Sequence, residues 1–247
     1  KPANVQIGDI MIANIVQADN DNATLTDATS DGWTFITGRK FGETNGGTSN
    51  PSQFEWWGTL LYKIATAADL TTTSYDFILN AAADDAVGGI VAFRGVDNIN
   101  PFDVAPGLIN LTNSDDLLAT SITTVTANAA IVMFGMDGDD ENFSAWVTAN
   151  ADPGALTEIL DEDFNADNLD MSVGAAWDIK VNAGGTGTGT GTAEFENFTS
   201  NFNGAILIAL RPCAATTAAP VITAPLCSGV TTVSGTSSEA DGTTIQV

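Results

Sequence analysis

The chain has 247 residues, of which 44% are hydrophobic, so it can bury a sizeable core. Its 31 acidic residues against 7 basic ones give a formal net charge of −24, which excludes nucleic acid and anionic lipid as expected partners because phosphate binding needs Lys and Arg. The absence of histidine removes Ser-His-Asp and Cys-His catalysis and, with only two cysteines, a tetrahedral zinc site. No run of about 18 apolar residues is present, so we expect no direct membrane insertion.

Four short apolar runs organise the chain: Asp9–Val16, Ala86–Asp97, Ala129–Met136 and Ala205–Pro212. Each is rich in Ile, Val and Ala and is bounded by Gly, Asn, Asp or Pro. This pattern is typical of strands that are buried on both faces. We therefore predict that the four runs are the inner strands of one β-sandwich.

Further strand patterns alternate with polar turns along the rest of residues 1–212, and Ala67–Leu70 is the best candidate for a helical turn. The segment Gly184–Thr192 reads GGTGTGTGT. It is either a flexible linker or a strand whose glycine face lies under a close neighbour, and the strict alternation favours the strand. About twelve strands without an amphipathic helix predict an all-β fold, a β-sandwich or jelly roll.

The composition changes after Pro212. Residues 213–227 are rich in Ala, Thr and Pro and read as a linker. Cys213 and Cys227 either form a disulfide, which closes a loop of about 15 residues and is worth about 3 kcal/mol, or remain two free thiols. Residues 228–247 contain two short strand patterns, which cannot form a sandwich alone. We expect the start of an immunoglobulin-like (Ig-like) module, truncated at Val247, and a longer natural polypeptide.

Several segments carry a family resemblance: Gly8–Ala13, Gly32–Thr34, Tyr62–Ala65, Val91–Asp97 with Asn100–Asp103, and Val173–Trp177. In this order they resemble a β-sandwich domain that recurs in very large bacterial surface and adhesin-like proteins. The tail, Pro220–Thr223 and Gly235–Thr243, resembles the start of the Ig-like repeats in giant adhesins of gliding bacteria, which are secreted by the type 9 system.

The resemblance implies an extracellular module on the bacterial cell surface and supplies no catalytic residues. Members of the family usually carry one more strand before the segment that matches Lys1-Pro2. The resemblance therefore leaves open either a missing N-terminal stretch or a strand that another chain supplies.

Two groups of acidic residues are candidate calcium sites. Asp161, Asp163, Asn165 and Asp167 stand at alternate positions, as in a Ca²⁺-binding loop. Ala166 and Ser172 depart from that pattern, where a turn glycine and a bidentate glutamate are expected. The second group is Asp137, Asp139, Asp140 and Glu141. For both groups the alternative is an acidic loop that is simply solvated.

Two other features have a structural and a functional interpretation. Trp56 and Trp57 are adjacent in a predicted strand, so they point to opposite faces. One of them could stack on a sugar ring, or one packs in the core while the other is partly buried. Arg94 and Arg211 each end a buried strand and are predicted to pair with carboxylates such as Asp97 or Asp103 as a structural clamp.

These features predict a non-enzymatic, extracellular adhesin or surface-filament module for structural display and attachment. Its partners would be surface polysaccharide or other adhesin modules, with self-association by strand addition at an open sheet edge. The alternative is a carbohydrate-binding, lectin-like domain. A glycosidase with paired carboxylates is the weakest hypothesis, because so acidic a chain brings carboxylates together by chance.

Overall fold

A computed structural model of the chain describes residues 1–19, 24–42, 55–140, 142–166, 169–193, 202–213, 221–222 and 235–236. The chain divides into two compact units, Lys1–Cys213 and Ala214–Val247. In the second unit, strands β15 (Val221–Ile222) and β16 (Gly235–Thr236) pair antiparallel. The Ig-like character of this unit remains a prediction.

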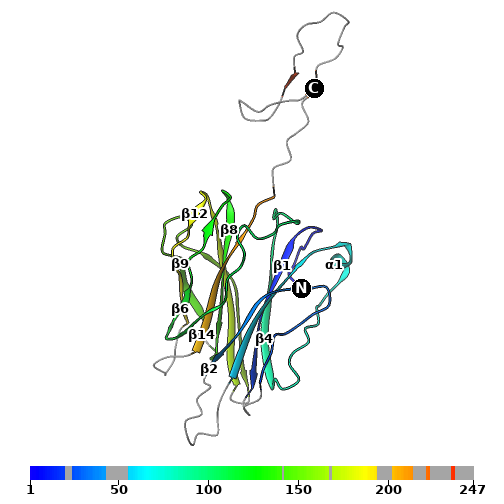
Figure 1. Ribbon diagram of the computed structural model, residues 1–247. Coiled ribbons are helices and arrows are strands. Elements are labelled where there is room, and N and C mark those ends of the chain that lie inside the picture. The colour runs from blue at the N-terminus through cyan, green and yellow to red at the C-terminus, as the bar shows by residue number, and fades with distance from the viewer. Residues whose placement is uncertain are drawn as a thin grey trace, which may run out of the picture. The chain divides into compact units, whose positions relative to one another are not determined.

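The first unit is an all-β sandwich, as predicted, built on two antiparallel sheets (Figure 1). Sheet one has the order β2-β3-β1-β4 and sheet two the order β10-β11-β8-β14-β5. The strands of sheet one are β1 (Ile10–Asp19), β2 (Thr34–Gly42), β3 (Glu55–Ile64) and β4 (Asp85–Phe93). Those of sheet two are β5 (Asn110–Asn113), β8 (Ala129–Asp137), β10 (Thr157–Ala166), β11 (Leu169–Lys180) and β14 (Phe202–Leu210).

The main core lies between the two sheets, where Leu60 and Val91 of sheet one meet Val132, Phe134 and Ile208 of sheet two. The other face of sheet two is covered by a three-stranded sheet in the order β6-β13-β9. Its strands are β6 (Asp116–Ala119), β9 (Phe143–Thr148) and β13 (Gly189–Ala193). The other face of sheet one carries a third apolar cluster around Trp33. Both main sheets are therefore buried on both faces along their central strands.

This layering confirms three of the four predicted inner strands. Strands β1 and β8 are buried along their whole length, and β14 is buried except at Phe202. The fourth prediction is wrong, because β4, which contains most of Ala86–Asp97, is half-buried and lies at the edge of sheet one. Its two faces do pack on apolar clusters, and hydrophobicity reports the burial of a strand's faces rather than the number of its neighbours.

Two shorter elements also match their predicted positions. The only helix among the described residues is α1 (Ala67–Thr71), at the predicted helical turn. The Gly/Thr segment forms β13 and the two-residue strand β12 (Gly184–Gly185), which pairs with β7 (Thr123–Thr124). A Cβ atom at Gly191 would lie 3.2 Å from the Trp146 ring, so the glycine face does lie under a close neighbour.

Candidate functional site

The first predicted calcium loop is not a loop, so this part of the prediction is wrong. Asp161, Asp163 and Asn165 lie in β10, a strand that pairs with β11 as a hairpin. Alternate residues of a strand share one face but are about 6.6 Å apart, so these side chains do not form the curled loop on which the predicted calcium pattern depends. Asp167, the fourth predicted ligand, lies outside the described residues.

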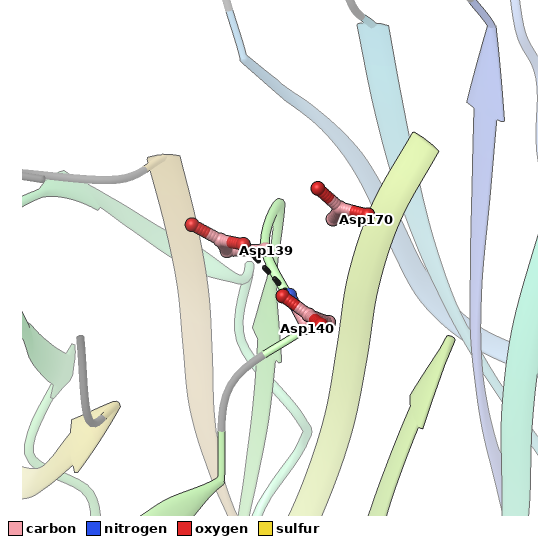
Figure 2. A group of neighbouring side chains, drawn as sticks. All are labelled: Asp139, Asp140 and Asp170. Atoms are coloured by element: carbon pink, nitrogen blue, oxygen red, sulfur yellow. Dashed lines mark hydrogen bonds between the residues drawn. The ribbon is translucent and has the colours of Figure 1, made fainter. Parts of the chain in front are cut away.

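The second predicted group is divided by the fold. Asp137 is the last residue of β8 and is fully buried, whereas Asp139 and Asp140 follow in the turn and are half-buried. Glu141 lies outside the described residues. The structure brings Asp139 and Asp140 to Asp170 of β11, and carboxylate oxygens of the three residues lie within 4.8 Å of one another (Figure 2). We call Asp139, Asp140 and Asp170 the acidic triad.

The surrounding contacts hold the acidic triad in place. The backbone N–H of Asp140 donates to the Asp139 carboxylate at 2.9 Å, and the Asn165 amide donates to the Asp140 carboxylate. The indole N–H of Trp56 donates to the backbone carbonyl of Asp170 at 3.1 Å. Burial, followed by the charges of Asp140 and Asp139, raises the pKa of Asp170 above its ordinary value. A hard cation that takes oxygen ligands, such as Ca²⁺, would relieve this repulsion.

A test of the acidic triad is the thermal unfolding midpoint in EDTA and in millimolar Ca²⁺. We expect Ca²⁺ to raise the midpoint of the wild type by several degrees, because an ion that binds only the native state stabilises it. The midpoint of Asp170→Asn should be the same in Ca²⁺ and in EDTA. In EDTA at neutral pH the variant should be the more stable protein. Because the pKa of the Asp170 carboxyl is raised in the folded state, this group does not reduce the stability of the wild type below pH 3.8. The wild type loses stability as the pH rises through the folded pKa of Asp170.

The matched control for this test is Asp163→Asn, which removes one carboxylate from β10 and should retain the Ca²⁺ response. An equal response to Ca²⁺ in the wild type and in Asp170→Asn would show that the acidic triad holds no ion.

The two tryptophans point to opposite sides of β3, as predicted. Trp56 is 9% exposed and packs in the main core. Trp57 is half-buried, and its indole N–H donates to the Asp27 carboxylate at 2.7 Å. Its ring lines an open hollow of about 680 Å³, together with Thr112, Asn113 and Phe202. Of the two, only Trp57 is placed to contact a ligand.

All seven basic side chains of the protein are engaged in contacts within the first unit. Five form ion pairs: Lys40 with Glu55, Lys63 with Asp69, Arg94 with Asp9, Lys180 with Asp152, and Arg211 with Asp103. The other two donate to backbone carbonyls, Lys1 to Asp69 and Leu70 and Arg39 to Ile109. The cations of this acidic protein therefore brace the fold.

The arginine clamps predicted for Arg94 and Arg211 are both present, one of them with a different partner. Arg211 pairs with Asp103, as predicted, with 3.6 Å between its Nε and a carboxylate oxygen. Arg94 instead pairs with Asp9, to which it donates two hydrogen bonds of 2.9 Å. Asp97 accepts the backbone N–H groups of Ile99 and Asn100 and so caps the turn after β4.

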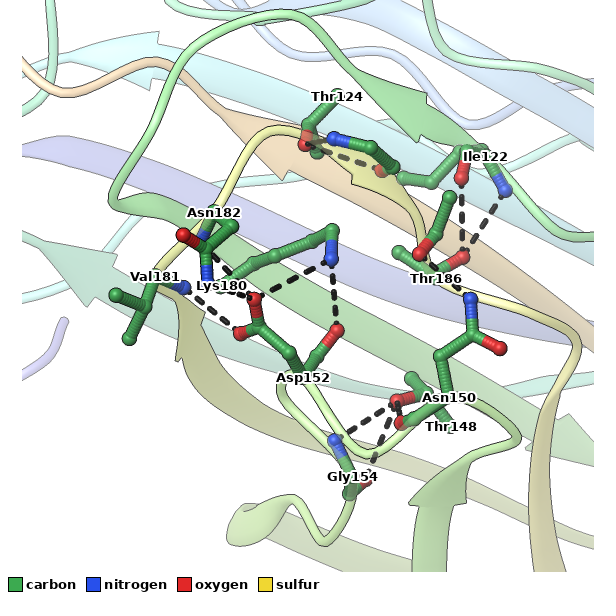
Figure 3. A network of polar contacts seen from close by, with 12 residues as sticks. Ile122, Thr124, Thr148, Asn150, Asp152, Gly154, Lys180, Val181, Asn182 and Thr186 are labelled. Atoms are coloured by element: carbon green, nitrogen blue, oxygen red, sulfur yellow. Dashed lines mark hydrogen bonds and ion pairs between the residues drawn. The ribbon is translucent and has the colours of Figure 1, made fainter.

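Lys180 belongs to a larger network of polar contacts (Figure 3). Its ammonium donates to the backbone carbonyl of Asp152 at 2.8 Å. The Asp152 carboxylate accepts the backbone N–H groups of Val181 and Asn182. This one aspartate thus ties the turn after β9 to the end of β11.

The predicted disulfide is untested. Cys213 is exposed and forms no disulfide with any residue that the structure describes, whereas Cys227 lies outside the described residues.

Sequence reasoning missed Asp170 as a member of the acidic triad. It lies within the predicted acidic loop, but its partners are about 30 residues earlier in the chain. The sequence does contain one signal for this contact. An acidic stretch around Asp139 and another around Asp170 are separated by strand patterns, so the two stretches could lie at the same end of neighbouring strands.

Comparison with protein-family models, with curated proteins and with solved structures finds no match to this chain. Among the described residues, no helix has the length and apolar character needed to cross a membrane.

Proposed function

We propose that this chain is a non-enzymatic structural module of an extracellular bacterial surface protein or surface filament. Its role would be structural display on the cell surface and attachment to surface polysaccharide or to other modules. The observation that carries the proposal is the use of all seven basic side chains as internal braces. Because the basic side chains are engaged internally, the surface of the protein is dominated by carboxylates. This negative charge repels anionic ligands and keeps the protein soluble. Its remaining means of contact are apolar and hydrogen-bonding groups, bound cations and open sheet edges.

The order of units supports the same proposal. A braced sandwich, Lys1–Cys213, is followed directly by a second compact unit, as in a protein built from modules in series. Five of the braces join segments far apart in sequence: Arg94 to Asp9, Arg211 to Asp103, Lys180 to Asp152, Lys1 to Asp69, and Arg39 to Ile109. Contacts between distant segments resist local opening of the sandwich, which suits a module that carries load.

A lectin-like domain is the second candidate, and the position of Trp57 favours it. Its half-buried ring lines an open hollow next to the polar side chains of Thr112 and Asn113. An aromatic ring beside a few hydrogen-bonding groups is a common arrangement for small-molecule recognition. The fixed indole N–H, which is bound to Asp27, would hold the ring in one orientation.

One experiment separates the two candidates. Beads coated with the full chain are passed over surface polysaccharide, and bound beads are counted in Ca²⁺ and in EDTA. We expect retention above that of beads coated with the unfolded chain, lower retention in EDTA, and unchanged retention for Trp57→Ala. Loss of retention in Trp57→Ala but not in Phe35→Ala, an exposed aromatic of β2, would assign a lectin. No retention in any condition would contradict both functions.

A further inference from the structure

The two main sheets have four edge strands, β2, β4, β5 and β10, and three of them are protected against pairing. Strand β2 has a register shift between Phe35 and Thr37 and carries Arg39 and Lys40. Strand β10 has a register shift after Glu158 and several carboxylates, and β5 is only four residues long. Bulges, charges and short length are the usual devices that keep an edge from pairing with another chain.

Strand β4 has no bulge and is not short, and charges lie only at its two ends. It is nine residues long and pairs with β1 without a register shift. No charged side chain lies between Asp85 and Arg94, in a protein whose net charge is −24. Among the described residues no strand pairs with its outer side. The outward N–H and C=O groups of β4 therefore form a template for another strand.

The surface beside β4 is hollowed along the strand. Two hollows of about 560 and 550 Å³ are lined by consecutive residues of β4 and the turn that follows it. The apolar walls of the hollow at the start of β4 come from Phe77 and Leu79, and those of the hollow at its end come from Ile159, Trp177 and Ile179. Pro2 lines both hollows. The side chains of an added strand would be buried against these walls.

The charges at the two ends of β4 indicate the occupant. The strand begins at Asp85, directly after Asp84, and is followed by Arg94, whose side chain is 56% exposed while it pairs with Asp9. A second β4 that runs antiparallel, with Gly89 opposite Gly89, places its acidic start beside this arginine. The same contact recurs at the other end. The edge is therefore complementary to itself, as a two-fold interface requires.

We propose that two copies of this chain associate through β4, antiparallel about a two-fold axis, so that both four-stranded sheets form one continuous sheet. The driving terms are the backbone hydrogen bonds of the new ladder and the burial of the apolar walls of the two hollows. At physiological ionic strength the Debye length is about 8 Å, so salt screens the repulsion between the distant carboxylates. The proposal concerns this edge alone and does not depend on attachment.

The test is the association constant from analytical ultracentrifugation of the full chain. We expect the wild type to dimerise and Asp85→Lys and Arg94→Glu each to weaken association at least about tenfold, which corresponds to about 1.4 kcal/mol. An equimolar mixture of the two variants should regain the dimer, because each end then joins opposite charges. Asp116→Lys, which makes the same charge change on exposed β6, is the matched control and should dimerise like the wild type.

Amide hydrogen exchange supplies a second readout, in case Arg94→Glu disturbs its pair with Asp9. Raising the wild-type concentration should slow exchange in Ala86–Phe93 and leave Thr34–Gly42 of β2 unchanged. A protein that stays monomeric at every concentration would overturn the proposal. A dimer that neither Asp85→Lys nor the mixture of variants affects, with β4 amides unprotected, would overturn it as well.

Discussion

Replacing Asp69 by asparagine is expected to lower the free energy of unfolding by about 3 kcal/mol, the range for breaking one partner of a buried ion pair. Asp69 is 1% exposed and lies in the short helix α1. Such a loss is large against the total stability of about 5–15 kcal/mol that folded domains have.

The size of this effect follows from the four groups that the carboxylate holds. One oxygen accepts the backbone N–H and the hydroxyl of Thr66, at 2.8 and 2.7 Å. The other accepts the Tyr75 hydroxyl at 3.0 Å and pairs with the Lys63 ammonium at 2.7 Å. An asparagine keeps the shape but loses the charge and half of the acceptor capacity. Lys63 and Tyr75 would then be left with poor partners in a largely buried place.

The pKa shifts of this cluster set its pH dependence. Burial would raise the pKa of Asp69, but the hydrogen bonds from Lys63, Thr66 and Tyr75 outweigh it and hold that pKa far below its ordinary value of 3.8. The stabilisation is therefore present above pH 3.8 and is lost as the pH falls toward the folded pKa. Burial, then the hydrogen bond to Asp69, raises the pKa of Tyr75 from 10.0 to about 12, so its contribution is lost as the pH rises from 10 to 12.

Urea unfolding over a pH series measures both effects. The exposed Asp76→Asn variant is the control, because it removes the same charge nearby and should stay within about 0.5 kcal/mol of the wild type. The protein has two tyrosines, so in Tyr62→Phe the phenolate absorbance reports Tyr75 alone. A stability of Asp69→Asn equal to that of Asp76→Asn would contradict the central role of Asp69.

Replacing Gly135 by alanine is expected to cost about 2–3 kcal/mol, a typical penalty for overpacking a core. Gly135 lies in the middle of β8, and a Cβ atom there would be 2.5 Å from Leu117 and 2.9 Å from Trp146. Both of these side chains are buried under the three-stranded sheet. The backbone carbonyl of Gly135 also accepts the buried Asn14 amide at 2.9 Å, so β8 cannot shift without breaking that bond.

A double-mutant cycle tests the cause of this loss. Leu117→Ala removes the nearest atom, so Gly135→Ala combined with Leu117→Ala should cost at least about 1 kcal/mol less than the sum of the single changes. Gly107→Ala is the control, because a Cβ atom there meets nothing within 4 Å and should leave stability nearly unchanged. Additive losses in the cycle would show that the clash with Leu117 is not the reason.

The fold class could be predicted from the sequence because burial on both faces leaves a local trace. The runs that became β1, β8 and β14 are rich in Ile, Val and Ala, which is typical of strands buried on both faces. The alternation of Gly and Thr that became β13 is likewise local, since side chains along a strand alternate between its faces.

Neither the acidic triad nor the open edge leaves such a trace. The acidic triad exists because the hairpin of β10 and β11 and the pairing of β11 with β8 bring Asp170 to Asp139 and Asp140. The same composition in another register would leave these carboxylates apart. That β4 lies at an edge depends on which strand is next to it, and Ala86–Asp97 is as apolar as an inner strand. By itself the sequence determined the sandwich, because burial is encoded residue by residue. Only the tertiary structure decided which charges meet and which strand stays open, because both depend on pairing between distant segments.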